Sequence, residues 1–414
     1  MTGRASIESI ERLLGTPEFF ADPFPVYNRL REEAPIYWCT RFNSWLITRY
    51  VDVMSVLRDT ERFSNRKRHT LLLQQLPADA QARLQRLRKH FEGQGLINSD
   101  PPSHTRLRKL SNKAFTPVMV EALRPRIARI VDELIDRIDV TSEFDLIGAL
   151  AYPLPTIVIA EMLGAPPDDR ARFQAWSESI TGFSQAGKID PARAEQAQQS
   201  VIELTEYFRE LIRQRRREPK NDLISALAAV REDGRTFSDE ELFDTCVTVL
   251  IAGHETTTSL IGNGMLELLR HPHQFRELGS NSELVKNAVE EVLRHQSPVL
   301  AMHRRVTRET EFRGVGMAEG DLLYMVLAAA NRDPAVVNDD PDRFDICRSL
   351  RDNKHVAFGF GTHFCLGAPL SRLEGAIAFG ALSRRFPRLR LAGEPRWKPN
   401  VMVRFLEHLP LASE

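Results

Sequence analysis

Apolar residues at helical spacing run through most of the 414-residue chain, and this periodicity limits the fold more than any other feature. It predicts helices over residues 104–140, 146–164, 191–217, 238–270 and 282–294. The longest of them begins at Ser238 and Glu241, which have the spacing of a capping box, and it ends before Pro272. Strand patterns are few and cover residues 44–48, 299–306 and 401–409. We therefore predict a mainly α protein with a minor β part.

The chain shows no internal repeat and no Gly/Ser linker, so residues 1–414 are predicted to form a single domain. Lys plus Arg and Asp plus Glu both number 56, and this balance argues against nucleic acid or an anionic membrane as the partner. The four cysteines are far apart in the sequence, which is typical of a protein of the reducing cytoplasm. No signal peptide and no apolar stretch long enough to cross a bilayer is present, so we predict a cytoplasmic protein without a membrane anchor.

The most informative segment surrounds one cysteine and reads Phe358-Gly-Phe-Gly-Thr-His-Phe-Cys365-Leu-Gly. Its glycines, Gly359, Gly361 and Gly367, allow the backbone to adopt positive φ angles and to approach a bulky group closely. Helical periodicity resumes directly after the cysteine, which places Cys365 at or just before a helix N-terminus. That position lowers the pKa of a thiol and favours the thiolate, the form that binds metal. A buried cysteine in a tight turn is the alternative interpretation.

The pattern F-x-x-G-x-x-x-C-x-G resembles the segment around the haem ligand of the cytochrome P450 superfamily. The resemblance implies the P450 fold, a large helical domain with small β-sheets in which haem b lies between a long central helix and the helix after the cysteine. It further implies that Cys365 is the axial thiolate of the haem iron and that Phe358 shields the sulfur from water. Backbone amides near Gly367 are then expected to donate hydrogen bonds to the sulfur.

Glu291 and Arg294 lie three residues apart and can form a salt bridge on one helix face. A solvated surface pair, which adds little stability, is the alternative. The superfamily has an E-x-x-R motif here, in which the pair forms a buried triad with an arginine of a later P-x-R-F segment. Arg343 in the sequence Pro341-Asp-Arg343-Phe344 fits that position. We expect the triad to serve folding and haem retention.

Glu255 and Thr256 are polar residues between apolar flanks inside the longest predicted helix. A polar patch on an exposed turn is the alternative. Gly253 costs a helix about 1 kcal/mol relative to alanine, which suggests either the close approach of a flat group or a local break. The stretch resembles the A-G-x-[D/E]-T motif of P450s, which implies that Glu255 and Thr256 deliver protons and that Ala252 lies beside the haem. His254 occupies the variable position and is expected to be an ordinary helix-face histidine.

Four side chains are candidate ligands of the haem propionates. His104 and Arg108 are four residues apart on one helix face, and a basic solvated helix start is the alternative reading. The resemblance to the H-x-x-x-R motif of P450s implies that both bind a propionate, and it adds Arg304 and His363. Arg305 follows Arg304 directly, so the sequence leaves open which of these two arginines is the ligand.

The resemblance also implies a set of apolar substrate contacts: Val249, Ala252, Val299, Leu300, Ala301, Met302 and Met402. Such a lining favours an apolar or amphipathic small molecule. The polar segment 65–99 is expected to be a mobile lid over this pocket. Residues 331–355, which are rich in Asp, Pro and Asn, are expected to be irregular and to serve a function.

Together these resemblances identify the chain as a haem-thiolate monooxygenase that inserts one atom of O2 into a C–H bond by hydroxylation or epoxidation. No flavin, iron–sulfur or nicotinamide motif is present, so the electrons are expected from a ferredoxin and its NAD(P)H-dependent reductase. Two alternatives stay open, namely a peroxide-driven peroxygenase or isomerase on the same fold, and a non-enzymatic haem-binding or sensor protein. A set of basic residues is either a docking patch for an acidic redox partner or a solvated face: Arg106, Arg108, Lys109, Lys113, Lys354 and Arg372.

Overall fold

The computed structural model describes residues 9–66, 73, 76–93, 95–185, 188–337 and 339–413. The chain forms two compact units. The first unit comprises Met1–Phe63, Leu123–Pro155 and Glu255–Glu414, and the second comprises Ser64–Ala122 and Thr156–His254. The chain passes from one unit to the other four times, once between α9 (Pro117–Ala122) and α10 (Arg124–Ile135) and three times within an element: β3 Phe63–Ser64, α11 Pro153–Met162 and α15 Asp239–Arg270.

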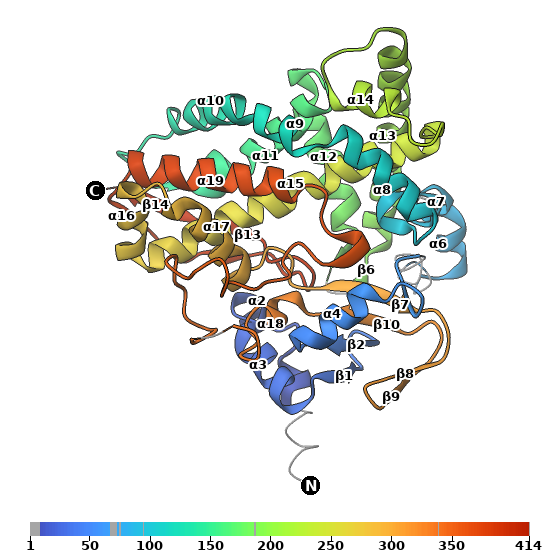
Figure 1. The fold of residues 1–414 in the computed structure, drawn as a ribbon, viewed down its shortest axis with the longest axis horizontal. Coiled ribbons are helices and arrows are strands. Elements are labelled where there is room, and N and C mark those ends of the chain that lie inside the picture. Colours follow the sequence, from blue (N-terminus) through green and yellow to red (C-terminus); the bar gives the residue numbers. More distant parts are fainter. Residues whose placement is uncertain are drawn as a thin grey trace. The chain divides into compact units, whose positions relative to one another are not determined.

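The first unit contains a five-stranded sheet with the strand order β1-β2-β10-β7-β3. β1 (Ile36–Cys39) runs antiparallel to β2 (Ser44–Ile47), and β10 (Leu322–Met325) runs parallel to β2 and antiparallel to β7 (Met302–Val306). Helices α3 (Phe24–Glu33), α4 (Tyr50–Arg58) and α18 (Leu327–Ala330) lie beside these strands (Figure 1). Their apolar side chains form two buried clusters with the sheet. One of these clusters includes Val356, two residues before the Cys365 segment, so the sheet supports that segment.

The remaining elements of the first unit are helices and short strands. Its other helical segments are α2 Pro17–Ala21, α10 Arg124–Ile135, η2 Ile147–Ala151, α16 Pro272–Ser280, α17 Leu284–His295, η4 Gly361–His363 and α19 Ala368–Arg385. Its other strands are β4 Phe144–Asp145, β8 Thr310–Phe312, β9 Val315–Met317, β11 Leu389–Leu391, β12 Arg396–Trp397, β13 Leu406–His408 and β14 Pro410–Ser413.

The second unit is almost entirely helical. Its elements are α6 Ala78–Arg83, α7 Gln85–Glu92, η1 Leu96–Asn98, α8 Ser103–Ala114, α9 Pro117–Ala122, η3 Pro167–Asp169, α12 Arg170–Gly182, β5 Ser184–Gln185, β6 Lys188–Ile189, α13 Pro191–Arg217 and α14 Leu223–Ala229. Aromatic rings hold α12 against α13, because Phe173 packs edge-on against Tyr207 with ring centroids 5.1 Å apart. Buried Arg215 binds Asp222 and thereby ties α13 to the start of α14.

The helix predictions are confirmed where the sequence carries clear end signals. The helix predicted over 191–217 is α13, whose N-cap Asp190 accepts hydrogen bonds from two backbone amides. The capping box of α15 is also present, since the Ser238 amide donates to Glu241 Oε2 (2.9 Å) and the Glu241 amide donates to Ser238 Oγ (3.2 Å). The helix predicted over 104–140 is instead divided into α8, α9 and α10. Pro117 cannot donate a hydrogen bond to the preceding turn, so a new helix begins there.

The three predicted strand regions contain β2, β7 and β13, respectively. Within residues 331–355, every position that the structure describes lies outside helices and strands, as predicted. The predicted lid 65–99 includes α6 and α7, while residues 67–72, 74, 75 and 94 of it lie outside the described residues. None of the four cysteines, all of which the structure describes, forms a disulfide. In the described part of the chain, no helix combines the length and the apolar character needed to cross a membrane.

Candidate active site around Cys365

The Cys365 segment folds into a tight loop in front of α19. Gly359 and Gly361 have φ angles of 69° and 72°, in the left-handed region that favours glycine. The Cys365 amide donates to the Phe358 carbonyl (3.0 Å) and closes the loop. Because α19 begins at Ala368, the thiol precedes a helix N-terminus, as the sequence predicts.

Neighbouring backbone and side chains hold this loop closely. A Cβ atom at Gly361 would lie 3.0 Å from the Leu57 carbonyl oxygen of α4. A Cβ atom at Gly359 would lie 3.3 Å from Cε of Met302 on β7. The two glycines therefore serve both the turn and the close packing of the loop.

Phe358 is surrounded by a charged cluster that the sequence did not predict. Glu290 of α17 accepts two hydrogen bonds from Arg372 of α19, at 2.6 and 2.8 Å, and one from His355 Nε2 at 3.0 Å. The Arg372 guanidinium lies over the Phe358 ring, 4.5 Å from its centre. Burial raises the pKa of Glu290, but the hydrogen bonds from Arg372 and His355 outweigh this effect and lower the pKa to about 2. The sequence feature that could have indicated this cluster is the second glutamate, Glu290, directly before Glu291 of the E-x-x-R motif.

Glu291 and Arg294 form the salt bridge that the motif predicts, and both side chains are fully buried. Arg294 donates to both carboxylate oxygens, at 2.7 and 2.8 Å. It also donates to the backbone carbonyls of Pro341 (2.6 Å) and Arg343 (3.0 Å) in the irregular segment. Asn353 and the amide of Asp345 donate to Glu291 from the same segment. The pair thus satisfies backbone groups that have no helix or strand partners.

The prediction that Arg343 is the third member of the triad is wrong. Its side chain is 49% exposed and pairs with Asp339 and Asp345. Arg348 takes the place instead: its side chain is 4% exposed, and its Nε lies 3.4 Å from Glu291 Oε1. The difference follows the burial pattern of the segment, in which Phe344, Ile346 and Arg348 are buried while Arg343 and Cys347 are exposed, and a turn closed by the hydrogen bond from the Arg348 amide to the Asp345 carbonyl (3.1 Å) brings Arg348 inward.

Helix α15 continues without a break through the A-G-x-E-T stretch. Ala252 is exposed and Glu255 and Thr256 are partly exposed, although this helix is buried further on. Gly253 is explained by packing within the second unit, because a Cβ atom there would lie 2.5 Å from Cδ1 of Ile159. His254 is buried, and its Nδ1 lies 3.0 Å from the Leu250 carbonyl, as expected of a helix histidine.

A buried polar contact follows the pair Glu255–Thr256. Thr257 Oγ1 donates to Ser371 Oγ of α19 (3.2 Å), and both residues belong to the first unit. One turn later on α19, Glu374 is fully buried, and neither of its carboxyl oxygens has a hydrogen-bond partner in the described part of the chain. Burial raises the pKa of Glu374 well above its usual value.

The candidate propionate ligands are divided between the units. His104 and Arg108 are on α8 in the second unit, where His104 is buried and Arg108 donates to Asn112 (3.0 Å). Arg304 and His363 are in the first unit. Of these, Arg304 is buried on β7, and His363 is partly exposed in the cysteine loop.

The substrate-contact candidates of the first unit come together. The amides of Leu300 and Ala301 donate to the Met402 carbonyl, at 2.8 and 3.4 Å, and Val299 forms a bridge with Val403. Met302 continues this segment into β7. Val249 and Ala252 are on α15, within the second unit.

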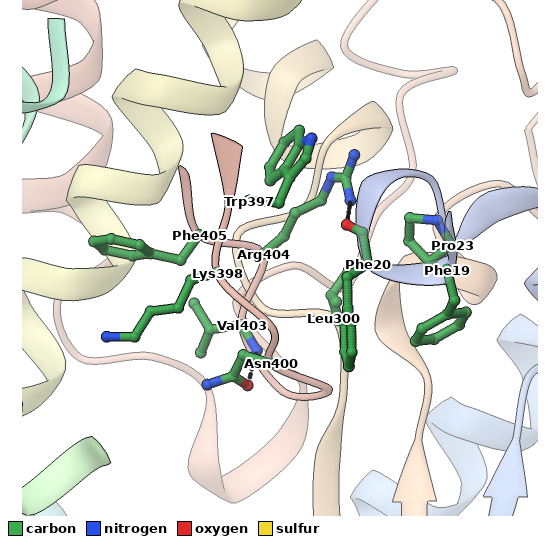
Figure 2. A pocket seen from close by; sticks show the side chains of 10 residues that line it. All are labelled: Phe19, Phe20, Pro23, Leu300, Trp397, Lys398, Asn400, Val403, Arg404 and Phe405. Carbon is green, nitrogen blue, oxygen red and sulfur yellow. Dashed lines mark hydrogen bonds between the residues drawn. The ribbon is translucent and has the colours of Figure 1, made fainter. Parts of the chain in front are cut away.

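Figure 2 shows a small pocket on the first unit, lined by residues of α2 and of the C-terminal segment. Its lining includes Leu300 and Arg404. Arg404 donates to the carbonyls of Phe20 (3.3 Å) and Ala21 (2.9 Å), and its guanidinium stacks on Trp397, 3.7 Å from the ring centre. Burial lowers the pKa of Arg404 to about 9. These contacts join the two ends of the chain, so we assign a structural role to this pocket wall.

Residues 45–401 match the family model of Cytochrome P450. The chain belongs to the cytochrome P450 family. It is 42% identical to cytochrome P450 107B1 of Saccharopolyspora erythraea, over 96% of this chain and 97% of that protein. It is 38% identical to 6-deoxyerythronolide B hydroxylase of the same organism, over 96% of this chain and 98% of that protein.

Among solved structures, the P450 chain resembles P450BioI in complex with an acyl carrier protein carrying hexadec-9Z-enoic acid. The TM-score is 0.86 at 36% identity, and the alignment covers 96% of this chain and 99% of that one. The mainly α fold with minor β-sheets is therefore the P450 fold, and the chain is an oxidoreductase of the monooxygenase class.

P450s carry a haem-thiolate cofactor, and they depend on redox partners and oxygen. The residues of this chain fit such a cofactor. Cys365 is partly exposed in front of a helix N-terminus, and on α15 Ala252 is exposed while Glu255 and Thr256 are partly exposed. Within the described residues, no three or more His, Cys, Asp or Glu side chains form a metal-binding group. A porphyrin supplies most ligands of its iron itself, so a single protein thiolate suffices.

Proposed function

We propose that Cys365 provides the axial thiolate of haem b and that this P450 oxidises an apolar or amphipathic small molecule by inserting one oxygen atom into a C–H bond. The loop that carries Cys365 is the main support. Two left-handed glycines and the hydrogen bond to Phe358 fix the thiol in front of α19, whose N-terminal amides favour a thiolate. When bound, the haem supplies oxygen activation, and thiolate ligation favours O–O cleavage.

The proposed catalytic residues of the chain itself are Glu255 and Thr256. They place a carboxyl group and a hydroxyl at successive, partly exposed positions of α15, within one turn of Ala252. Such a pair can hold a proton and pass it on during oxygen activation. The role of Glu291, Arg294 and Arg348 is structural in this proposal.

Arg304 is the better candidate of the two adjacent arginines for the propionate. Side chains alternate along a strand, so Arg304 shares its face of β7 with Met302 and Val306. Met302 lies against Gly359, and Val306 belongs to the cluster that contains Val356. This face therefore meets the cysteine loop, which supports Arg304. His104, Arg108 and His363 complete the proposed propionate site.

The proposed substrate contacts are apolar, which favours an apolar or amphipathic substrate. The segment Val299–Met302 is hydrogen-bonded to Met402, and this contact supports a common wall in the first unit. Val249 and Ala252 are the proposed contacts from α15. The names of two relatives, a 6-deoxyerythronolide B hydroxylase and a P450 bound to a fatty-acyl carrier protein, agree with such a substrate class.

We propose a ferredoxin and its NAD(P)H-dependent reductase as the electron source, because the chain has no flavin or iron–sulfur motif of its own. The predicted basic docking patch is largely neutralised by acids. Arg106 pairs with Glu241, both Lys109 and Lys113 pair with Glu232, and Arg372 pairs with Glu290. These ion pairs do not support a docking patch for an acidic partner. Lys354, another member of the predicted patch, is exposed. The single domain over 1–414 is part of the proposal, supported by one family model that runs through both units.

The test is the carbon monoxide difference spectrum of the purified, dithionite-reduced protein. We expect the strongly red-shifted Soret band of thiolate ligation, and we expect Cys365→Ser to abolish it. Cys347→Ser is the matched control, because Cys347 is an exposed free thiol outside the loop and its loss should leave the band unchanged. A red-shifted band in Cys365→Ser, or its absence from the wild type, would refute the proposed ligation.

A further inference from the structure

We propose that Glu290 is a positioning residue that holds Phe358 in place and thereby sets the reduction potential of the haem. The inference rests on the proposed ligation by Cys365. Glu290 itself is distant in sequence from the cysteine and acts through two other side chains, Arg372 and His355.

The first contact runs through Arg372. Its two parallel hydrogen bonds to Glu290, at 2.6 and 2.8 Å, use both carboxylate oxygens and fix the plane of the guanidinium. The guanidinium carbon Cζ lies 4.5 Å from the centre of the Phe358 ring, within the range of a cation–π contact. Arg372 is 35% exposed, so without Glu290 the long side chain would be free to turn into solvent.

The second contact runs through His355 to the backbone. Its Nε2 lies 3.0 Å from Glu290, and its Nδ1 accepts a hydrogen bond from the Ala357 amide at 3.3 Å. Ala357 directly precedes Phe358. Glu290 consequently restrains both the ring of Phe358 and the peptide that leads into it.

Phe358 in turn is coupled to the cysteine. Its carbonyl accepts the hydrogen bond from the Cys365 amide (3.0 Å), so a shift of Phe358 moves the loop that carries the thiol. Access of water to the sulfur and hydrogen bonds to it are among the factors that set the potential of a metal–thiolate centre. Releasing Phe358 should admit water, and water that donates to the sulfur withdraws electron density and favours the reduced state.

An ordinary ion pair that only ties α17 to α19 is the alternative. A second alternative is a direct charge effect, since removing any negative charge near a haem favours reduction. The geometry favours positioning, because both Arg372 and His355 contact Phe358 or its neighbour, and because the Glu290–Arg372 pair has no net charge.

The experiment measures the reduction potential of purified holoprotein by spectroelectrochemical titration, with thermal unfolding measured in parallel. The variants are Glu290→Gln, Arg372→Lys, Arg372→Gln and the charge-neutral double variant Glu290→Gln/Arg372→Gln. Arg372→Lys keeps the charge but loses the planar contact with two hydrogen bonds to Glu290. This variant can therefore test the proposal if Glu290→Gln folds poorly. Each single variant is repeated in a Phe358→Ala background.

We expect all single variants and the double variant to shift the potential in the same direction, to less negative values. We also expect these shifts to disappear in the Phe358→Ala background. Opposite shifts for Glu290→Gln and Arg372→Gln that cancel in the double variant would overturn positioning in favour of charge. Lower thermal stability with unchanged reduction potentials would overturn the proposal and show that the ion pair only connects α17 to α19. A wild type without the thiolate carbon monoxide band would instead refute the proposed ligation, before any variant is compared.

Discussion

Glu290 and Glu291 are neighbours on α17, yet they bind different parts of the first unit. Glu291 is fully buried and accepts hydrogen bonds from Arg294, Arg348 and Asn353. Glu290 is 19% exposed and binds Arg372 and His355 beside the cysteine loop. Successive helix positions differ by about 100° in direction, so Glu291 faces Arg348 and Asn353 of the irregular segment, and Glu290 faces α19 and the end of that segment at His355.

The difference shows how one helix serves both stability and the site. The contacts of Glu291 take the place of the backbone hydrogen bonds found in helices and strands. Its partners Arg294 and Arg348 donate to backbone carbonyls that no helix or strand satisfies. The partners of Glu290 contact the cysteine loop: Arg372 lies over the Phe358 ring, and His355 binds the amide of Ala357 beside it. Loss of the first should therefore weaken the whole protein, whereas loss of the second should act mainly on the cysteine loop.

The largest expected effect separates the two acids directly. Glu291→Gln leaves Arg294 and Arg348 buried without a negative partner and should cost about 3–5 kcal/mol of stability. Glu290→Gln loses charged hydrogen bonds near the surface and should cost about 1–2 kcal/mol. Urea unfolding midpoints and the yield of soluble holoprotein measure the contrast. Equal losses in the two variants would show that the acids do not differ in role.

Arg348 and Arg343 provide the second contrast. Arg348→Ala removes a buried donor to Glu291 and to three backbone carbonyls, and since unsatisfied buried groups cost about 1–3 kcal/mol, we expect a total loss of about 2–4 kcal/mol. Arg343→Ala removes an exposed pair and should change stability by less than about 1 kcal/mol. Urea midpoints of both variants measure this. A greater loss of stability in Arg343→Ala than in Arg348→Ala would show that Arg343 is the third member of the triad, as the P-x-R-F pattern suggests.

Much of the fold and of the site was predictable because short-range signals fix them. Helix α13 has Asp190 and Pro191 at its start and a run of arginines at its end, and its predicted bounds are confirmed. The order of the glycines around Cys365 likewise predicts a loop in front of a helix, because a left-handed backbone and a helix start are local properties. Family membership then follows from the same short motif.

The remaining features depend on contacts between distant segments. Strand β10 has no strong pattern of its own and is fixed by pairing with β2 and β7. The sequence suggests a flat group near Gly253, but the side chain that requires this glycine is Ile159. Glu290 carries no local sign that Arg372, far along the chain, lies beside it. Arg348 is the partial exception, since the alternation Phe344-x-Ile346-x-Arg348 was present in the sequence.

The smallest expected effect concerns pH and again separates Glu290 from an ordinary surface acid. Hydrogen bonds from Arg372 and His355 lower the pKa of Glu290 from 4.5 to about 2 in the folded protein. A lowered pKa stabilises the fold above the unfolded value of 4.5, and this contribution is lost as the pH falls from 4.5 toward 2. The difference in urea midpoint between wild type and Glu290→Gln should therefore be constant between about pH 7 and 5.5 and should shrink below about pH 4.5. Glu319→Gln, at an exposed position, should match the wild type at every pH. A difference that persists undiminished at about pH 3 would show that the carboxylate charge of Glu290 is not what stabilises this cluster.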